Sequence, residues 1–278
     1  MSYIKYRREG FIVVNSKKKI KSKMFYARTY RHLNPNYKEM TAYYLLFSLP
    51  CLFILLLTYS KITKIYSEWS LKVLLAFVPA EELAITSGKF LPYFGDVFFV
   101  TLPNKIPSDT FVVSNIIAVL LLLIICYNVK DRAKPIATYL SMGLLIHLVA
   151  SIFFLFIPEA FPYTITDYSD LYMKQQVGIW LSFFVIASLV SGGISYSRSS
   201  KFVMLFAVMG YSLIFGFLRY VVYLVFLLKA STLYMAILFF TFGPFFDFLY
   251  LVCIYSIYIN VLTKKFDGKD GNAEWQWA

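Results

Sequence analysis

Apolar runs of about 20 residues recur along this chain and constrain its fold more than any other feature. Two of them extend from Gln175 to Gly193 and from Phe202 to Leu228. Of the 278 residues, 59% are hydrophobic and 15% are charged, and the mean hydropathy is +0.66, far above that of a soluble domain. Because a bilayer leaves exposed backbone groups unbonded, and because the runs lack strand-like alternation, we expect an all-α, polytopic bundle of transmembrane helices.

Six runs predict clear spans. They are Ala42–Ser60, Thr110–Tyr127, Ile136–Ile157, Val177–Ser195, Phe202–Leu228 and Thr232–Leu262. Between the first two, the apolar segments Leu71–Ile85 and Phe90–Leu102 are short and interrupted by prolines. We interpret these two segments as interfacial or re-entrant pieces on the outer side. If both cross instead, the count becomes eight and the orientation of the later spans is unchanged.

Basic residues are distributed unevenly between the two sides of the predicted bundle. With the N-terminus inside, cytosolic segments hold 19 of the 27 Lys and Arg residues, outer segments hold seven, and Arg219 lies within a span. This asymmetry predicts that both termini face the cytosol, in the inner or plasma membrane of a cell. We expect a basic cytosolic arm (residues 1–40), a transmembrane domain (41–262) and a cytosolic tail (263–278).

Two segments outside the spans each have two interpretations. Residues 1–39 hold eleven Lys and Arg residues, which either lie on anionic lipid or form a disordered determinant of topology. The outer loop of residues 158–176 is aromatic and acidic, which fits a ligand-facing surface or an ordinary aromatic belt. The net charge of +12 lies mainly beside apolar runs, so we expect lipid and not nucleic acid as its partner.

Four polar side chains lie within different predicted spans, at estimated depths of about 8 to 22 Å from the outer face. They are Asn115, His147, Arg219 and Asp247. One interpretation is a polar site that opens outward. The other is structural: Arg219 and Asp247 pair to hold two helices, while Asn115 and His147 form hydrogen bonds between helices.

Known catalytic and metal-binding motifs are absent from the sequence. It has no HExxH, no GxSxG nucleophile and no Walker A motif, and Glu81-Glu82 lacks the arginine that would complete an EExxxR motif. The three cysteines stand alone, without the CxxC spacing of zinc or redox sites. We therefore expect no metal and no cofactor.

Residues Gln175 to Tyr258 resemble the C-terminal half of the exosortase/archaeosortase family. These are membrane cysteine transpeptidases associated with extracellular polysaccharide loci and surface-protein sorting. In that family a Cys-Ser-Gly type motif opens one helix, a basic turn follows, and the next helices carry an Asn-x-x-Arg type motif and a histidine. The segments of this chain that match in order are QQVGIW, SRSSK, GFLRY and FGPFFDFLY.

The resemblance assigns Gly178 to the glycine of the first motif and Arg219 to the arginine of the second. Gln176 stands at the position of the nucleophilic cysteine, Gly216 where the asparagine often lies, and Phe246 or Asp247 in place of the histidine. A carboxamide has no thiolate-like form with which to attack a carbonyl. The resemblance therefore implies a family scaffold that has lost its cysteine chemistry.

These observations favour a non-catalytic, exosortase-like membrane protein that assists a cell-surface process. Export or assembly of an extracellular polysaccharide, or sorting of surface proteins, would make other membrane proteins of such a system its partners. Two alternatives stay open. One is an intramembrane transferase or hydrolase that uses His147 or Asp247 as a base, and the other is a small membrane carrier.

Overall fold

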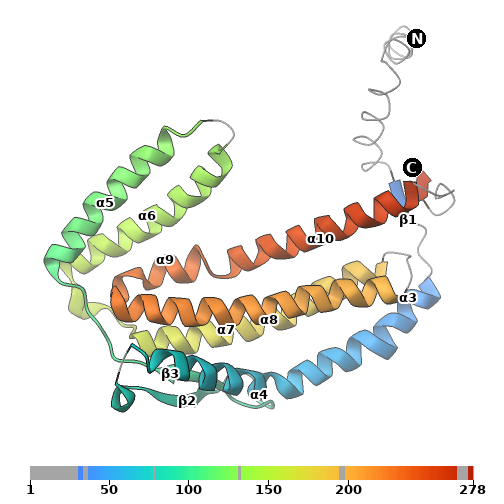
Figure 1. Ribbon diagram of the computed structural model, residues 1–278, viewed down its shortest axis with the longest axis horizontal. Coiled ribbons are helices and arrows are strands. Elements are labelled where there is room, and N and C mark those ends of the chain that lie inside the picture. The colour runs from blue at the N-terminus through green and yellow to red at the C-terminus, as the bar shows by residue number, and fades with distance from the viewer. Residues whose placement is uncertain are drawn as a thin grey trace, which may run out of the picture.

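We describe the protein by a computed structural model, which covers residues 31–33, 37–77, 79–130, 133–193, 198–267 and 275–277. Most of these residues are helical (Figure 1). Six helical segments are long and apolar enough to cross a membrane: Tyr37–Leu74, Asp109–Tyr127, Lys134–Phe156, Ile165–Gly192, Lys201–Lys229 and Thr232–Val261. The prediction of a predominantly helical bundle with six clear spans is confirmed at this level, whereas the orientation of the bundle stays a prediction.

The first long helix changes its winding near its start. It consists of α3 (Tyr37–Tyr43), the π-helical segment η1 (Tyr44–Ser48) and α4 (Leu49–Leu74). The wider turn of η1 precedes Pro50, whose ring lacks a backbone N–H and would clash with the preceding turn of a regular α-helix. The sequence suggested an end near Ser60. The helix continues to Leu74 because its polar residues there, including Ser67 and Ser70, are fully buried against neighbouring elements.

The chain that follows α4 forms a β-hairpin. After the short 3-10 helix η2 (Ala80–Glu82), strand β2 (Ala84–Gly88) pairs antiparallel with β3 (Val97–Thr101), with Ala84 opposite Thr101. The sequence had suggested interfacial or re-entrant pieces or two more spans for residues 71–102. Those interpretations missed the hairpin, because its apolar residues face the helices and not lipid: Val97 and Val100 are fully buried.

The edge of β3 that β2 leaves unpaired takes its hydrogen-bond partners from helices. Backbone N–H groups of β3 and the residue after it donate to side-chain hydroxyls of α4, α7 and α8: Phe98 to Thr63 (3.2 Å), Leu102 to Thr166 (3.0 Å) and Val100 to Tyr220 (3.1 Å). A buried strand edge needs such partners, because an unpaired backbone group away from water is costly. The hairpin is thus fixed to the helical bundle.

α7 (Ile165–Gly193) and α8 (Arg198–Lys229) form the centre of the bundle. Thr164 and Asp167 cap the start of α7 reciprocally: Thr164 N donates to Asp167 Oδ2 (2.7 Å), and Asp167 N donates to Thr164 Oγ1 (3.1 Å). Much of the predicted outer loop is therefore helical. Tyr168 and Tyr172 within it are buried in the hydrophobic core, so they form neither an exposed ligand surface nor an aromatic belt.

The remaining helices flank this centre on one side. α5 (Asp109–Tyr127) and α6 (Lys134–Phe156) form a helical hairpin that stands apart from the α7–α8 pair (Figure 1). The sixth span is interrupted: 3-10 helix η4 (Thr232–Tyr234) and α9 (Met235–Phe240) are followed by a turn at residues 241–243 and then by α10 (Pro244–Asp267). The 3-10 turn η3 (Pro158–Ala160) leads from α6 toward α7.

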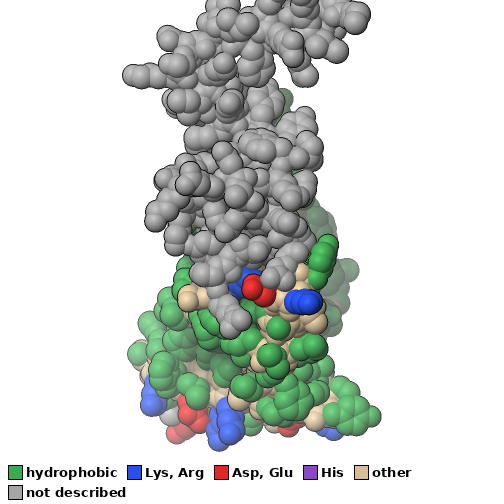
Figure 2. Space-filling view, turned by 90° about the vertical axis from the view of Figure 1, so that its right-hand side faces the viewer, with side chains coloured by type: hydrophobic (Ala, Val, Ile, Leu, Met, Phe, Trp, Pro, Cys, Tyr) green, Lys and Arg blue, Asp and Glu red, His purple; other side chains and the backbone are tan. Residues whose placement is uncertain are grey.

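The two ends of the described chain meet at one end of the bundle. Strand β1 (Arg31–Leu33) pairs antiparallel with β4 (Trp275–Trp277), near the end of α10 (Figure 1). Hydrophobic side chains cover most of the described surface seen from this end, with acidic and basic side chains gathered in a few places (Figure 2). Residues 1–30 of the predicted basic arm lie outside the described residues, so both interpretations of the arm stay predictions.

Candidate functional site

Arg219 lies in the middle of α8, and every N–H of its guanidinium donates a hydrogen bond. An arginine side chain offers five such donors. The acceptors are Tyr172 Oη (2.7 Å), the carbonyls of Phe242 (3.1 Å) and Gly243 (3.2 Å), Gln176 Oε1 (3.0 Å) and Asp247 Oδ2 (2.6 Å). Three long helices and one turn therefore converge on a single cation.

Local structure explains why these acceptors meet. Tyr172 and Gln176 are four residues apart in α7, so their side chains lie on the same face of that helix. At the turn between α9 and α10 the carbonyls of Phe242 and Gly243 both point to Arg219, although that of Gly243 also accepts from the backbone N–H groups of Phe246 (3.1 Å) and Asp247 (3.3 Å). Asp247 follows in the first turn of α10. The Gly243-Pro244 dipeptide is the sequence signal for this break.

The Arg219–Asp247 ion pair that the sequence suggested is present and deeply buried. The two residues are 4% and 0% exposed, and their charged atoms are 2.6 Å apart. Their estimated depths differed by more than the reach of an arginine. In the structure the sixth span is not a straight helix, because a turn at residues 241–243 precedes Asp247. The rings of Tyr172 and Phe215 lie 5.3 and 5.6 Å from the guanidinium carbon, close enough for cation–π attraction.

Gln176 fills the space between α7 and α8. Its carboxamide oxygen accepts from Arg219, and its Nε2 donates to the carbonyl of Ser212 (3.5 Å). A Cβ atom on Gly216 would lie 2.5 Å from Gln176 Nε2, so the glycine makes room for the carboxamide. Gly178 stands outside this network: its Cβ position is near the ring of Phe90, at 4.0 Å.

Asn115 and His147 belong to a second network. Asn115 Nδ2 donates to His147 Nε2 (2.8 Å) and to Ser151 Oγ (3.0 Å), and Tyr234 Oη donates to Asn115 Oδ1 (2.9 Å). The rings of His147 and Tyr234 stack with 4.6 Å between their centroids. The four polar residues that the sequence placed in one depth band thus form two pairs, and none of these hydrogen bonds joins the pairs.

Several buried polar atoms near the helix break have no hydrogen-bond partner among the described residues. They are Asp247 Oδ1, Thr241 Oγ1, Tyr168 Oη and both amide atoms of Gln175. The guanidinium has no donor left for a ligand, so the remaining polar capacity lies in these atoms. No group of three or more His, Cys, Asp or Glu side chains in the described part of the chain is arranged to hold a metal ion.

Sequence reasoning named Gln176 but missed the other neutral acceptors around Arg219. Tyr172 was assigned to an outer loop, although its spacing of four from Gln176 was a signal that both share a helix face. The carbonyls of Phe242 and Gly243 have no side-chain signal at all. Only the Gly243-Pro244 dipeptide marked where backbone acceptors would become free.

Comparison with known proteins gives no relative. The chain matches no protein-family model, no curated protein and no solved structure.

Proposed function

We propose that this multi-pass membrane protein keeps an exosortase-like scaffold without catalysis and assists a cell-surface process in the inner or plasma membrane. The process would be the export or assembly of an extracellular polysaccharide, or the sorting of surface proteins. Its partners would be the other membrane proteins of that system, with anionic lipid at the basic arm.

The main support for this proposal is that Gln176 and Asp247, which are far apart in the sequence, both lie within hydrogen-bond distance of Arg219. The resemblance placed Gln176 at the nucleophile position, Arg219 at the arginine position and Asp247 at the histidine position, on three separate helices. Arg219 Nη2 is within hydrogen-bond distance of both Gln176 Oε1 (3.0 Å) and Asp247 Oδ2 (2.6 Å). Positions that once formed a catalytic group would be expected to meet in this way. Arg219 and Asp247 would also pair as buried opposite charges in an unrelated bundle, so the presence of Gln176 at the same point is the specific support.

The chemistry of the meeting point supports a non-catalytic role. Gln176 offers no thiolate, and its carboxamide is bonded on both sides. Asp247 is fully buried and its Oδ2 is bound to Arg219, which leaves only the buried Oδ1 to accept a proton. The enzyme alternative with His147 as base is also weakened, because the ring is 2% exposed and bonded to Asn115.

Disruption of the gene in its source organism tests the cell-surface role. Surface polysaccharide would be measured with lectins and surface proteins by biotin labelling, and we expect at least one of them to fall. Complementation with Gln176→Ala should restore the surface, because no nucleophile is needed. Asp247→Asn should restore it as well, because an amide oxygen still accepts from Arg219. Expression in the membrane fraction and a single symmetric peak in detergent are the controls for folding.

Each outcome decides a different part of the proposal. An unchanged cell surface after disruption would refute the cell-surface role. A well-folded Asp247→Asn variant that fails to complement would refute the non-catalytic role and favour the enzyme alternative with Asp247 as base.

A small carrier is the second candidate, and the interrupted sixth span favours it. Broken helices supply free backbone groups for substrates in many transporters. In this protein the carbonyls of Phe242 and Gly243 are already occupied by Arg219, which ranks the carrier below the first proposal. Uptake of labelled sugars or amino acids by liposomes that contain the purified protein would support the carrier.

A further inference from the structure

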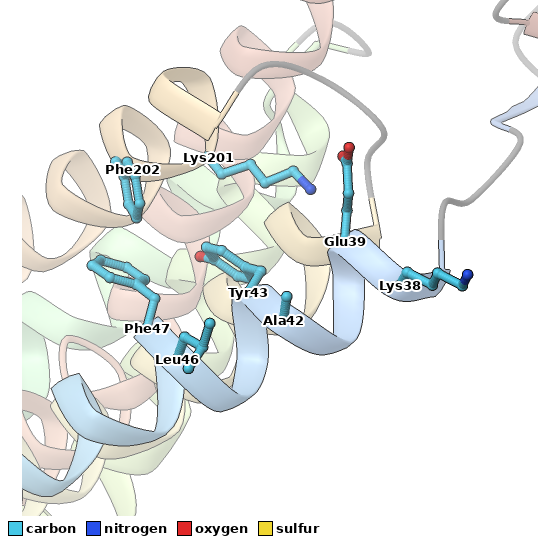
Figure 3. A pocket seen from close by; sticks show the side chains of 8 residues that line it. All are labelled: Lys38, Glu39, Ala42, Tyr43, Leu46, Phe47, Lys201 and Phe202. Carbon is cyan, nitrogen blue, oxygen red and sulfur yellow. The ribbon is translucent and has the colours of Figure 1, made fainter.

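A cavity of about 350 Å³ lies far along the bundle from Arg219, where α3 and η1 approach the start of α8. It is lined by Lys38, Glu39, Ala42, Tyr43, Leu46, Phe47, Lys201 and Phe202 (Figure 3). One wall is therefore apolar and aromatic, while two lysines and one glutamate supply charge. A second cavity of about 440 Å³, between the α5–α6 hairpin and the helix break, is almost wholly apolar and offers no such recognition.

Lys201 is the unusual member of this lining, because it is only 4% exposed. Lysine is rarely buried to this degree unless its ammonium has partners. Its Nζ donates to the carbonyl of Gly192 (3.3 Å), at the end of α7, and lies 5.5 Å from the centre of the Tyr43 ring. Figure 3 shows the ammonium directed across the cavity from the start of α8 toward α3. An ammonium carries three N–H donors, so the carbonyl leaves donor capacity for a ligand.

The aromatic wall is held rigidly. Phe47 and Phe202 stack edge to face with 4.2 Å between their centroids, and Tyr43 Oη shares a hydrogen bond with Ser191 Oγ (3.0 Å). Leu46 and Phe47 belong to the π-helical segment η1, and single π-helical turns occur often at functional sites. Leu46 is 80% exposed, so the wall continues outward as an apolar surface.

The cavity also lies at the level where lipid headgroups are expected. Lys38 is the second residue of the first candidate span, and Lys201 is the first residue of the fifth. Both mark the end of the bundle that the distribution of basic residues predicts to be cytosolic. Anionic lipids are enriched in that leaflet, and basic pockets between helices on that side bind their headgroups.

We propose that this cavity binds the phosphate of an anionic phospholipid, with Lys201 at its floor, Lys38 at its rim and an acyl chain along Leu46 and Phe47. The charges fit a phosphodiester. Lys201 and Lys38 supply ammonium groups, which form charge-assisted hydrogen bonds with phosphate oxygens. A free phosphate would meet the same ammonium groups but would leave the apolar wall uncovered.

The test uses the purified full-length protein in a neutral detergent. Its melting temperature would be followed while dioctanoyl phosphatidylglycerol is added, with dioctanoyl phosphatidylcholine and inorganic phosphate as parallel probes. We expect a saturable rise for phosphatidylglycerol, and a half-saturating concentration at least tenfold higher for each of the other two. Tenfold corresponds to about 1.4 kcal/mol of binding free energy.

Variants separate the site from general lipid effects. Ala42→Trp should raise the half-saturating concentration about tenfold or more, because Ala42 is exposed at the cavity and an indole would fill it without removing a charge. Lys201→Gln should have the same effect, and Lys38→Gln, at an exposed position, keeps the test valid if Lys201→Gln does not fold. Lys72→Gln is the matched control, an exposed lysine near the far end of α4, and should change nothing.

Three results would overturn the proposal. The first is no saturable response to phosphatidylglycerol. The second is equal binding of inorganic phosphate or phosphatidylcholine, which would indicate a plain anion site or unspecific lipid contact. The third is unchanged binding in both Ala42→Trp and Lys38→Gln.

Discussion

Replacing Asp247 by alanine is the sharpest test of what holds the centre of this protein together. Of the five acceptors around Arg219, Asp247 alone carries a formal charge. Asp247→Ala would leave the guanidinium 4% exposed, with one N–H unpaired and no counter-charge bonded to it. Breaking a buried ion pair by removing one partner typically costs about 3–5 kcal/mol.

Two matched variants of the same network should behave differently. Tyr172→Phe removes two hydrogen bonds, the one accepted from Arg219 Nε and the one donated to the carbonyl of Gly216, and hydrogen bonds between helices in membrane proteins average about 0.6 kcal/mol each, with a maximum of about 1.7 kcal/mol. The double variant Arg219→Met with Asp247→Leu removes both charges and keeps the volume filled. Such replacements are often neutral or stabilising, so we expect a stability within about 1 kcal/mol of the wild type.

Equilibrium unfolding in mixed micelles, driven by added SDS and followed by circular dichroism, would measure these free energies. We expect stability to fall from the wild type and the double variant, through Tyr172→Phe, to Asp247→Ala. A loss below about 1 kcal/mol for Asp247→Ala would contradict a buried charge that depends on its partner. A double variant as unstable as Asp247→Ala would show that packing at this point, and not charge, determines stability.

Three further predictions concern contacts elsewhere in the bundle. Gly143→Leu should destabilise the protein by at least about 1 kcal/mol, because a Cβ at this position would lie 2.6 Å from the side chain of Thr241; Gly210→Ala, with open space around it, is the control in the same unfolding assay. Tyr234→Phe should cost about 0.6–1.7 kcal/mol through the lost bond to Asn115, and a loss above 3 kcal/mol would contradict a single hydrogen bond. Thr166→Val should speed hydrogen exchange at Leu102, whose N–H it leaves unpaired, without changing exchange in α5; unchanged exchange at Leu102 would contradict the role of the hydroxyl.

The sequence predicts some parts of this fold and not others, because an apolar run does not show whether it faces lipid or protein. A long apolar run indicates contact with lipid, so the six spans could be predicted. Helix α5 begins and ends within one residue of its predicted bounds. The same signal fails where apolar residues face protein. Val97 and Val100 look like part of a membrane segment but are buried in a hairpin. Ser67 and Ser70 look like the end of a span but point into the bundle.

The residues of the candidate site could likewise be predicted only in part. Arg219 and Asp247 could be found because charges within apolar runs are rare and need partners. Of their neutral partners, Gln176 was named by the resemblance and Tyr172 was marked only by its spacing from Gln176, while the two backbone carbonyls have no side-chain signal. Depth estimates along straight helices also grouped His147 with Arg219, whereas the short elements η4 and α9 place His147 against Tyr234 in a network of its own.

The turn between α9 and α10 has a mechanical consequence. Tyr139 of α6 donates to the carbonyl of Thr241, while Tyr223 (3.0 Å) and Arg219 (3.1 Å) of α8 donate to that of Phe242. Adjacent peptide groups are thus anchored to different helices. A displacement of the α5–α6 hairpin would pull on the peptide group that precedes Phe242, while Arg219 holds the peptide group that follows it. Force applied at the edge of the bundle would reach its central cation through the Tyr139 hydroxyl and the backbone of Phe242.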